Sequence, residues 1–138
     1  MSERPPQLPP PANPALLPVL AAVVYVAAVV ALWGILSLLL DREVIDYPDA
    51  GPLLGPAMVA SAGIVTWLAL VRTGRSRSPW PGTIAAVFIA GAAMLAVAAI
   101  GYGPVAAPHF AISPFVLSAA ALSGVTVLVM WAVHPRAR

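Results

Sequence analysis

Four long apolar runs without a formal charge constrain what this chain can fold into. The first covers residues 16–40, and the others cover residues 52–71, 83–101 and 112–133. A hydrocarbon core of about 30 Å is crossed by about 20 helical residues, so each run is long enough, or nearly so, to cross it. The sequence therefore predicts an all-α polytopic membrane protein, with four transmembrane helices in an up-down bundle.

The composition supports a membrane protein and argues against other classes. Hydrophobic residues make up 61% of the chain and charged residues 9%, whereas soluble domains are about half apolar and a quarter charged. The absence of Cys excludes disulfides and thiolate catalysis. No cluster of basic and aromatic residues indicates a nucleic-acid partner, and no catalytic or cofactor motif is present. We expect no enzyme activity, no cofactor and no nucleic-acid partner, and the lipid bilayer as the surroundings.

The segments outside the apolar runs define the predicted domain organisation. Residues 1–14 are rich in proline and are expected to form a disordered, extended arm in the cytoplasm. Residues 15–133 are expected to form the transmembrane domain, and residues 134–138 a cytoplasmic tail. The first run is too long for a signal peptide and follows a proline-rich leader instead of a basic one, so we interpret it as a retained helix.

Prolines suggest where the helices begin. A proline at the first helical position is tolerated, whereas one in the helix interior removes a hydrogen bond and clashes with the preceding turn. Each helix is therefore predicted to begin at its last proline. Pro114 would begin the fourth helix with Ser113 as its N-cap. Pro56 would begin the second, with residues 52–55 either irregular or joined to the helix through a kink, which we slightly favour.

The arginines predict the orientation. All but one of them lie in three segments that must share a side: the arm with Arg4, the second connection with Arg72, Arg75 and Arg77, and the tail with Arg136 and Arg138. Arg42 lies on the other side. The positive-inside rule then places both termini in the cytoplasm of a protein in the cell membrane. The first connection would face outward.

Four acidic residues gather in that first connection: Asp41, Glu43, Asp46 and Asp49. Their spacing lacks the glycine and the distal Glu of a calcium loop, and a short polar loop beside Pro48 and Gly51 would be solvated, so neither metal binding nor carboxylate catalysis is favoured. We interpret the cluster as a water-facing turn. A docking surface for a basic partner segment stays open as an alternative. His109 and His134 are predicted to lie on opposite faces of the membrane and to have no metal or haem role.

Small residues recur at helical spacing in the last two runs. The candidate helix-packing residues are Ala86, Ala90 and Gly91 in the third run and Ala119, Ser123 and Gly124 in the fourth. Small side chains let helix backbones approach closely, which drives packing in lipid. Most of this pattern would serve the bundle itself, and part of it could form a surface for other membrane subunits or for self-association.

The predicted spans contain hydroxyl side chains but no formal charge. Ion-coupled carriers and voltage sensors use charged groups inside the membrane, and the hydroxyls form no continuous polar stripe. We expect them to bond to helix backbones or to bridge helices. The preferred interpretation is a non-catalytic structural or accessory subunit. The alternative is a small oligomeric channel or carrier for an uncharged or apolar substrate.

The sequence resembles two families of membrane proteins. DAGPLLGPAMVA at residues 49–60 resembles small uncharacterised four-span membrane proteins of actinobacteria, a resemblance that implies no known activity. The length, the number of spans and SPWP at residues 78–81 are also similar to those of the fourth subunit of actinobacterial cytochrome c oxidase. That second resemblance is the fainter one.

Overall fold

The computed structural model describes residues 13, 16–45, 51–73, 76 and 78–133. Its helices are α1 (Leu16–Leu40), α2 (Leu54–Thr73), α3 (Trp80–Tyr102), α4 (Ala106–Ala111) and α5 (Pro114–Val133). The helices α1, α2, α3 and α5 are long and apolar enough to cross a membrane. The predicted fold class, all-α with four transmembrane-type helices in a bundle, is confirmed.

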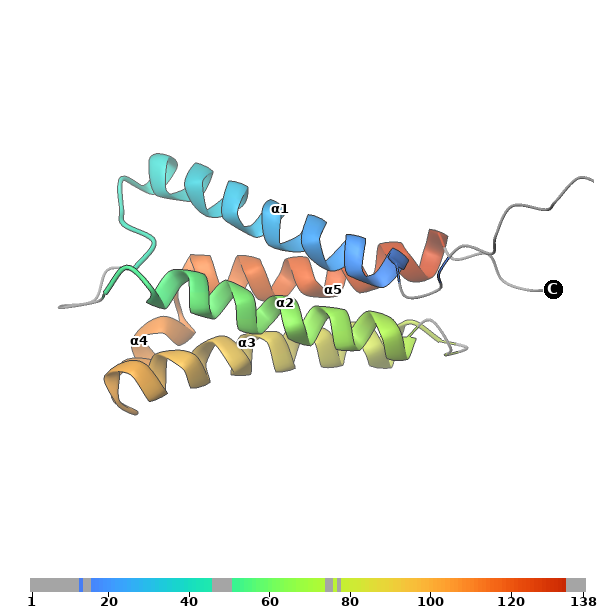
Figure 1. Cartoon of the computed structure of the whole chain (residues 1–138). Helices are drawn as coiled ribbons and strands as arrows, with labels where there is room; N and C mark the ends of the chain where they lie inside the picture. The colour runs from blue at the N-terminus through green and yellow to red at the C-terminus, as the bar shows by residue number, and fades with distance from the viewer. Residues whose placement is uncertain (1–12, 14–15, 46–50, 74–75, 77, 134–138) are drawn as a thin grey trace, which may run out of the picture.

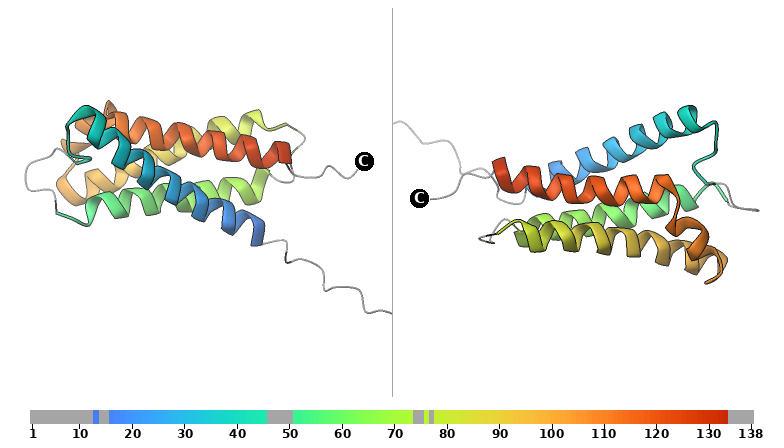
Figure 2. Two further views of the ribbon diagram at one scale, coloured as in Figure 1. Left: turned by 90° about the horizontal axis from the view of Figure 1, so that it is seen from above. Right: turned by 180° about the vertical axis from the view of Figure 1, so that it is seen from behind.

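The four long helices run up and down, with α2 and α5 in the middle of the bundle (Figure 1). Helix α1 packs on these two helices from one side and α3 packs on them from the other. The left view of Figure 2 shows α1 crossing the middle pair at an angle, and the right view shows its C-terminal end diverging from them. Helix α1 begins at the end of the bundle where α5 ends, and the α1–α2 connection and α4 lie at the opposite end.

The helix starts correct the proline prediction. Helix α2 begins at Leu54, ahead of Pro56, and α3 begins at Trp80, ahead of Pro81. Only the first-turn N–H groups of a helix lack an intrahelical partner, and a proline is tolerated anywhere within that turn, not only at its first position. The kink at Pro56 was also wrong, because the Ala57 N–H donates to the carbonyl of Leu53 at 3.0 Å and the helical bonding runs past the proline. Helix α5 does begin at Pro114.

Asp41 ends helix α1 through its backbone conformation, which its charge did not suggest. Its φ of 48° places it in the left-handed region, which Asp visits more readily than most residues. The next N–H, of Arg42, donates to the carbonyl of Ser37 at 3.3 Å, and the Ser37 hydroxyl donates to the carbonyl of Arg42 at 2.6 Å. The backbone bond is the long-range bond of a Schellman cap. Part of the acidic connection is therefore a helix stop.

Helix α4 was not predicted, because it lies in residues 102–111, the connection between the predicted third and fourth spans. Gly103 has a φ of 84°, a conformation that glycine adopts at no steric cost, and it turns the chain after α3. The Ala106 N–H then donates to the carbonyl of Gly103 at 3.1 Å. Helix α4 packs against α3 and α5, so the third connection folds back over the end of the bundle.

The helices differ in how much of each is buried. Helix α1 buries Tyr25, Val29 and Trp33, one residue per turn on a single face. In its most apolar window 17% of the residues are buried, against 44% in the corresponding window of α2. Helix α3 buries a stripe of mostly small residues at the same spacing, namely Ala86, Ala90, Met94 and Ala98. The tight core therefore lies among α2, α3 and α5, and α1 is the least embedded helix.

Candidate functional site

The predicted helix-packing residues lie in contacts between α5 and its neighbours: Gly124 and Gly91 lie where α3 meets α5, and Ser123 faces α2. Ala86 and Ala90 of α3 are buried, as are Ala119, Ser123 and Gly124 of α5. A Cβ atom added to Gly124 would lie 2.5 Å from Cγ2 of Val87, closer than real Cβ contacts come, so the two backbones need glycine here. A Cβ atom on Gly91 would lie 3.7 Å from that of Ala120, in ordinary contact. These residues face other helices of their own bundle and do not form an open surface.

Hydroxyl groups join the helices in the middle of the bundle. Thr66 Oγ1 of α2 donates to the carbonyl of Ala62 at 2.8 Å and lies 2.8 Å from Ser123 Oγ of α5. Because Thr66 has a single hydroxyl proton, Ser123 is the donor in the contact between them. Ser61, Ser118 and Thr126 donate to carbonyls of their own helices, as expected. These hydroxyls are therefore engaged in helix packing.

Helix α1 is attached to α5 by long side chains that reach its main chain. The Tyr25 hydroxyl donates to the carbonyl of Ala119 at 3.0 Å, and Nε1 of Trp33 donates to the carbonyl of Phe115 at 2.8 Å. The rings of Trp33 and Phe115 also meet edge to face, with their centroids 6.2 Å apart. These contacts attach α1 to α5 through side chains that reach the main chain of α5.

An apolar groove, which we call the α1–α2 groove, runs between α1 and α2. It consists of a hollow of about 700 Å³ toward the α1–α2 connection and one of about 520 Å³ toward Trp67, and both are lined by Val26 and Ala60. A Cβ atom on Gly63 would lie 2.8 Å from Cγ2 of Val26, so the two helices touch there. A Cβ atom on Gly34, in contrast, would meet nothing within 4 Å. The groove therefore opens toward the end where α1 diverges.

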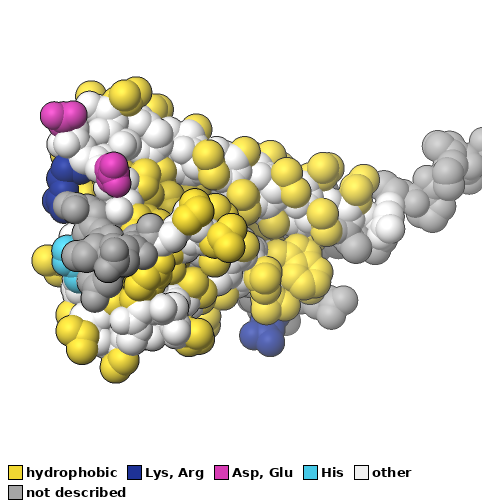
Figure 3. Space-filling model, turned by 60° about the vertical axis from the view of Figure 1, so that its left-hand side comes forward, with side chains coloured by type: hydrophobic (Ala, Val, Ile, Leu, Met, Phe, Trp, Pro, Cys, Tyr) yellow, Lys and Arg dark blue, Asp and Glu magenta, His cyan; other side chains and the backbone are white. Residues whose placement is uncertain are grey.

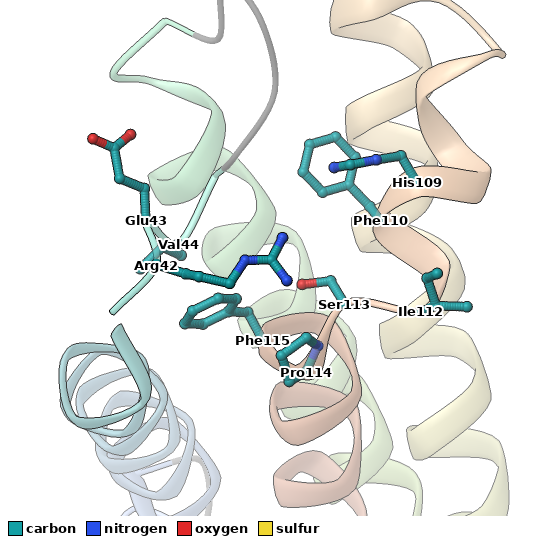
Figure 4. A pocket seen from close by; sticks show the side chains of 9 residues that line it. All are labelled: Arg42, Glu43, Val44, His109, Phe110, Ile112, Ser113, Pro114 and Phe115. Atoms are coloured by element: carbon teal, nitrogen blue, oxygen red, sulfur yellow. The ribbon is translucent and has the colours of Figure 1, made fainter. Parts of the chain in front are cut away.

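A second, smaller hollow of about 120 Å³, the end pocket, lies where the α1–α2 connection meets α4 and the start of α5 (Figure 4). The guanidinium of Arg42 points into it toward Ser113, whereas the carboxylate of Glu43 points away. His109 also lines the pocket, with its ring edge-on to Phe110 at a centroid distance of 5.5 Å. Sequence reasoning missed this pocket. Its signal was the single arginine within the acidic connection.

The structure describes two of the four candidate docking acids. Asp41 and Glu43 are exposed, and Asp46 and Asp49 lie outside the residues that the structure describes. Among the described residues, no group of three or more His, Asp and Glu side chains could hold a metal ion. In Figure 3 the acidic and histidine side chains gather at one end of the molecule, and hydrophobic side chains cover much of its length. The described acidic residues and His109 thus lie at the end of the bundle that carries the end pocket.

Comparison with known proteins assigns the chain to a family but gives it no activity. A protein-family model described as a family of unknown function, DUF6121, matches residues 12–138. No curated protein and no solved structure matches the chain. The α1–α2 groove and the end pocket are therefore the features from which a function can be inferred.

Proposed function

Because this chain belongs to the family of unknown function DUF6121, its role has to be inferred from its own surfaces, and we propose that it is a non-catalytic accessory subunit of the cell membrane. Its four long apolar helices are compatible with a multi-pass membrane protein. In this proposal the α1–α2 groove receives a transmembrane helix of a larger membrane protein. The observation that carries the proposal is this groove beside the least embedded helix.

The side chains of the groove suit a helix as its occupant. Lipid tails are as apolar as the groove, so helices associate in a bilayer where small residues let their backbones approach. The lining includes Ala22, Ala27, Ala60, Gly34 and Gly63. The groove extends from Trp67, near the end of α2, to Gly51, just before its start. A partner helix could therefore lie along most of the length of α2.

The non-catalytic role is supported by the chemistry of the bundle interior. The buried polar residues of the long helices are Thr66, Thr73 and Ser123, and the first and last of these bond to each other. Hydroxyls engaged in this way have no neighbouring base to activate them and serve packing instead. The small oligomeric channel or carrier is the alternative, in which the groove would receive another copy of the same chain.

The proposed orientation has both termini in the cytoplasm. Helix α2 ends and α3 begins at the end of the bundle where α1 begins and α5 ends (Figure 1), and the sequence there carries Arg72, Arg75 and Arg77. The positive-inside rule assigns that end to the cytoplasm. The chain has no Cys, so Glu43→Cys and Ala137→Cys can each be labelled alone in intact cells. We expect a membrane-impermeant maleimide to label the first variant and not the second; labelling of only the second would reverse the orientation.

Site-specific photocrosslinking tests the accessory role. A photoreactive amino acid is placed at Val23 or Ala60 in the groove, and at Phe88 of α3, which is 73% exposed, as the matched control. We expect the groove positions to crosslink one larger membrane protein that co-purifies in fixed ratio, and Phe88 not to. An additional Ala60→Leu substitution should reduce the Val23 crosslink by filling the groove.

The other outcomes decide against the proposal. Crosslinks from the groove to a second copy of this chain alone would support the oligomeric alternative. Crosslinks to lipid alone, or equal crosslinking from Phe88 and the groove, would show that the groove has no protein occupant. The accessory role would then be rejected.

A further inference from the structure

The end pocket brings together Arg42, Ser113 and His109, none of which lines the α1–α2 groove. We propose that it binds a phosphate group at the membrane surface, as carried by the headgroup of a phospholipid or by a free phosphate ion. The residues that bind the phosphate are Arg42, Ser113 and His109. The α1–α2 groove has no part in this proposal, so the two can fail separately.

Arg42 supplies the charge and the geometry. A guanidinium presents five N–H donors in a planar fork that matches two phosphate oxygens, and it stays charged at every physiological pH. Figure 4 shows this group directed into the pocket toward Ser113. A fork with five donors can engage an anion and keep another contact at the same time.

The backbone of Arg42 is held in place by the end of α1. Its N–H and its carbonyl are both bonded to Ser37, at 3.3 Å to the carbonyl and 2.6 Å to the hydroxyl. The left-handed conformation of Asp41 directs the chain across the end of the bundle. The helix cap therefore fixes the point from which the Arg42 side chain extends, and fixed donors lose less entropy on binding.

Ser113 and His109 add donors from the opposite wall. Ser113 is half-buried, and its backbone N–H donates to the carbonyl of Phe110 at 3.0 Å, which positions its hydroxyl opposite Arg42 (Figure 4). His109 comes from α4, the helix that folds the third connection over the bundle. Glu43 also lines the pocket, but its carboxylate points away from Arg42 and Ser113 (Figure 4), so it does not occupy the space between these two side chains.

The position and size of the pocket fit a headgroup phosphate. The pocket lies between the end of α1 and the start of α5, where a transmembrane bundle meets the phosphate layer. Its volume of about 120 Å³ accommodates a small tetrahedral anion and leaves acyl chains outside. Leu38, Leu39 and Ile112 expose 85%, 76% and 82% of their surfaces at the same level. Lipid tails attached to a bound phosphate would meet these side chains.

Native mass spectrometry of the full chain in a maltoside detergent tests the site. The probes are dioctanoyl phosphatidylglycerol and, as its phosphate-free counterpart, dioctanoylglycerol. We expect the phosphatidylglycerol to bind and Arg42→Gln to weaken it by about tenfold or more, since a hydrogen bond to a charged group contributes about 1.5–3 kcal/mol. Arg42→Lys should give an intermediate loss, because it keeps the charge and removes the fork. Arg72→Gln, an exposed arginine at the end of α2, is the matched control and should leave binding unchanged.

Competition with inorganic phosphate distinguishes the two sources. Displacement of phosphatidylglycerol by millimolar inorganic phosphate would assign the site to the free ion, and persistence of lipid binding would assign it to a lipid headgroup. Equal binding to the Arg42→Gln and Arg72→Gln variants, with both monodisperse and helical by circular dichroism, would overturn the proposal. Equally tight binding of dioctanoylglycerol would also overturn it.

Discussion

Helices α3 and α1 flank the same pair of central helices and are held to it in opposite ways. Helix α3 meets α5 through small residues, and a Cβ atom on Gly124 would collide with Val87. Helix α1 meets α5 through Tyr25 and Trp33, whose polar atoms reach the main-chain carbonyls of Ala119 and Phe115. One contact is made by close approach of backbones and the other by long side chains.

The difference shows how a small membrane protein leaves part of its surface unfilled. Small residues in lipid give a contact without hollows, and the α3–α5 contact follows that rule. The α1–α2 groove lies beside α1, the helix that is joined to α5 by long side chains. A further hollow of about 540 Å³ lies between the start of α2 and the end of α3, so the α3–α5 contact is filled while both flanking helices leave unfilled surface against α2.

Replacing Gly124 by Ala should give the largest loss of stability. The added Cβ atom would lie 2.5 Å from Cγ2 of Val87 and 3.4 Å from Cγ2 of Thr83, and both of these side chains are branched at Cβ and stiff. Overpacking of this kind costs about 1–3 kcal/mol, reduced by up to about 1 kcal/mol because Ala favours a helix more than Gly does. We expect a net loss of about 1–2 kcal/mol in the free energy of unfolding, measured by SDS titration in mixed micelles.

Gly91→Ala is the matched control for that variant. Its Cβ atom would be in ordinary contact with Ala120, at 3.7 Å, so the variant should be neutral or more stable by up to about 1 kcal/mol. If both glycine variants lose the same stability, close approach at Gly124 is not what distinguishes the α3–α5 contact. The comparison between α3 and α1 would then fail.

The sequence predicted the four long helices because lipid imposes a simple requirement. A segment such as residues 16–40, uncharged over a length that exceeds the bilayer core, has few structures open to it. The small-residue pattern around Ala90 and Gly124 could likewise be recognised as helix packing. These features follow from solvent and spacing, which a sequence displays directly.

The sites could not be predicted in this way, because they depend on how elements distant in the sequence lie together. The end pocket needs Arg42 from the α1–α2 connection and Ser113 from the start of α5. It also needs α4, a helix of six residues within the segment that the sequence predicted to be the connection between the third and fourth spans. The α1–α2 groove results from the angle at which α1 crosses its neighbours, and that angle cannot be recognised from the residues of α1 alone.

Trp33→Phe should loosen α1 and leave the α3–α5 contact unchanged. The substitution keeps an aromatic ring and removes the donor to the carbonyl of Phe115, at a cost of about 1 kcal/mol. In a Val29→Cys background, where position 29 is fully buried and no other Cys exists, maleimide labelling should become about fivefold faster. An unchanged rate would mean that this bond does not hold α1, and attachment through long side chains would rest on Tyr25 alone.

The bond between Thr66 and Ser123 should make a smaller contribution. It joins the two central helices, α2 and α5, at 2.8 Å, and interhelical hydrogen bonds in membrane proteins average about 0.6 kcal/mol in double-mutant cycles. A cycle of Thr66→Val, Ser123→Ala and the double variant should give a coupling of this size in the free energy of unfolding. A coupling above about 2 kcal/mol would show that hydroxyl bonding, and not the close approach of small residues, dominates the central contact.

Gly34→Ala should have the smallest effect on the isolated chain and gives the sharpest test of the difference between α1 and α3. The new Cβ atom would meet nothing within 4 Å, so the variant should be neutral or slightly more stable, by up to about 1 kcal/mol, as a Gly to Ala change in an exposed helix is. The fold of the single chain does not need a glycine at position 34. The approach of another helix would explain why a glycine stands there. Gly34→Leu should then weaken the crosslink from Val23 in cell membranes while the purified chain unfolds as before. If Gly34→Leu leaves that crosslink intact, Gly34 is not a docking position. If it destabilises the isolated chain as Gly124→Ala is expected to do, Gly34 is needed by the fold itself, and α1 and α3 are more alike than their contacts indicate.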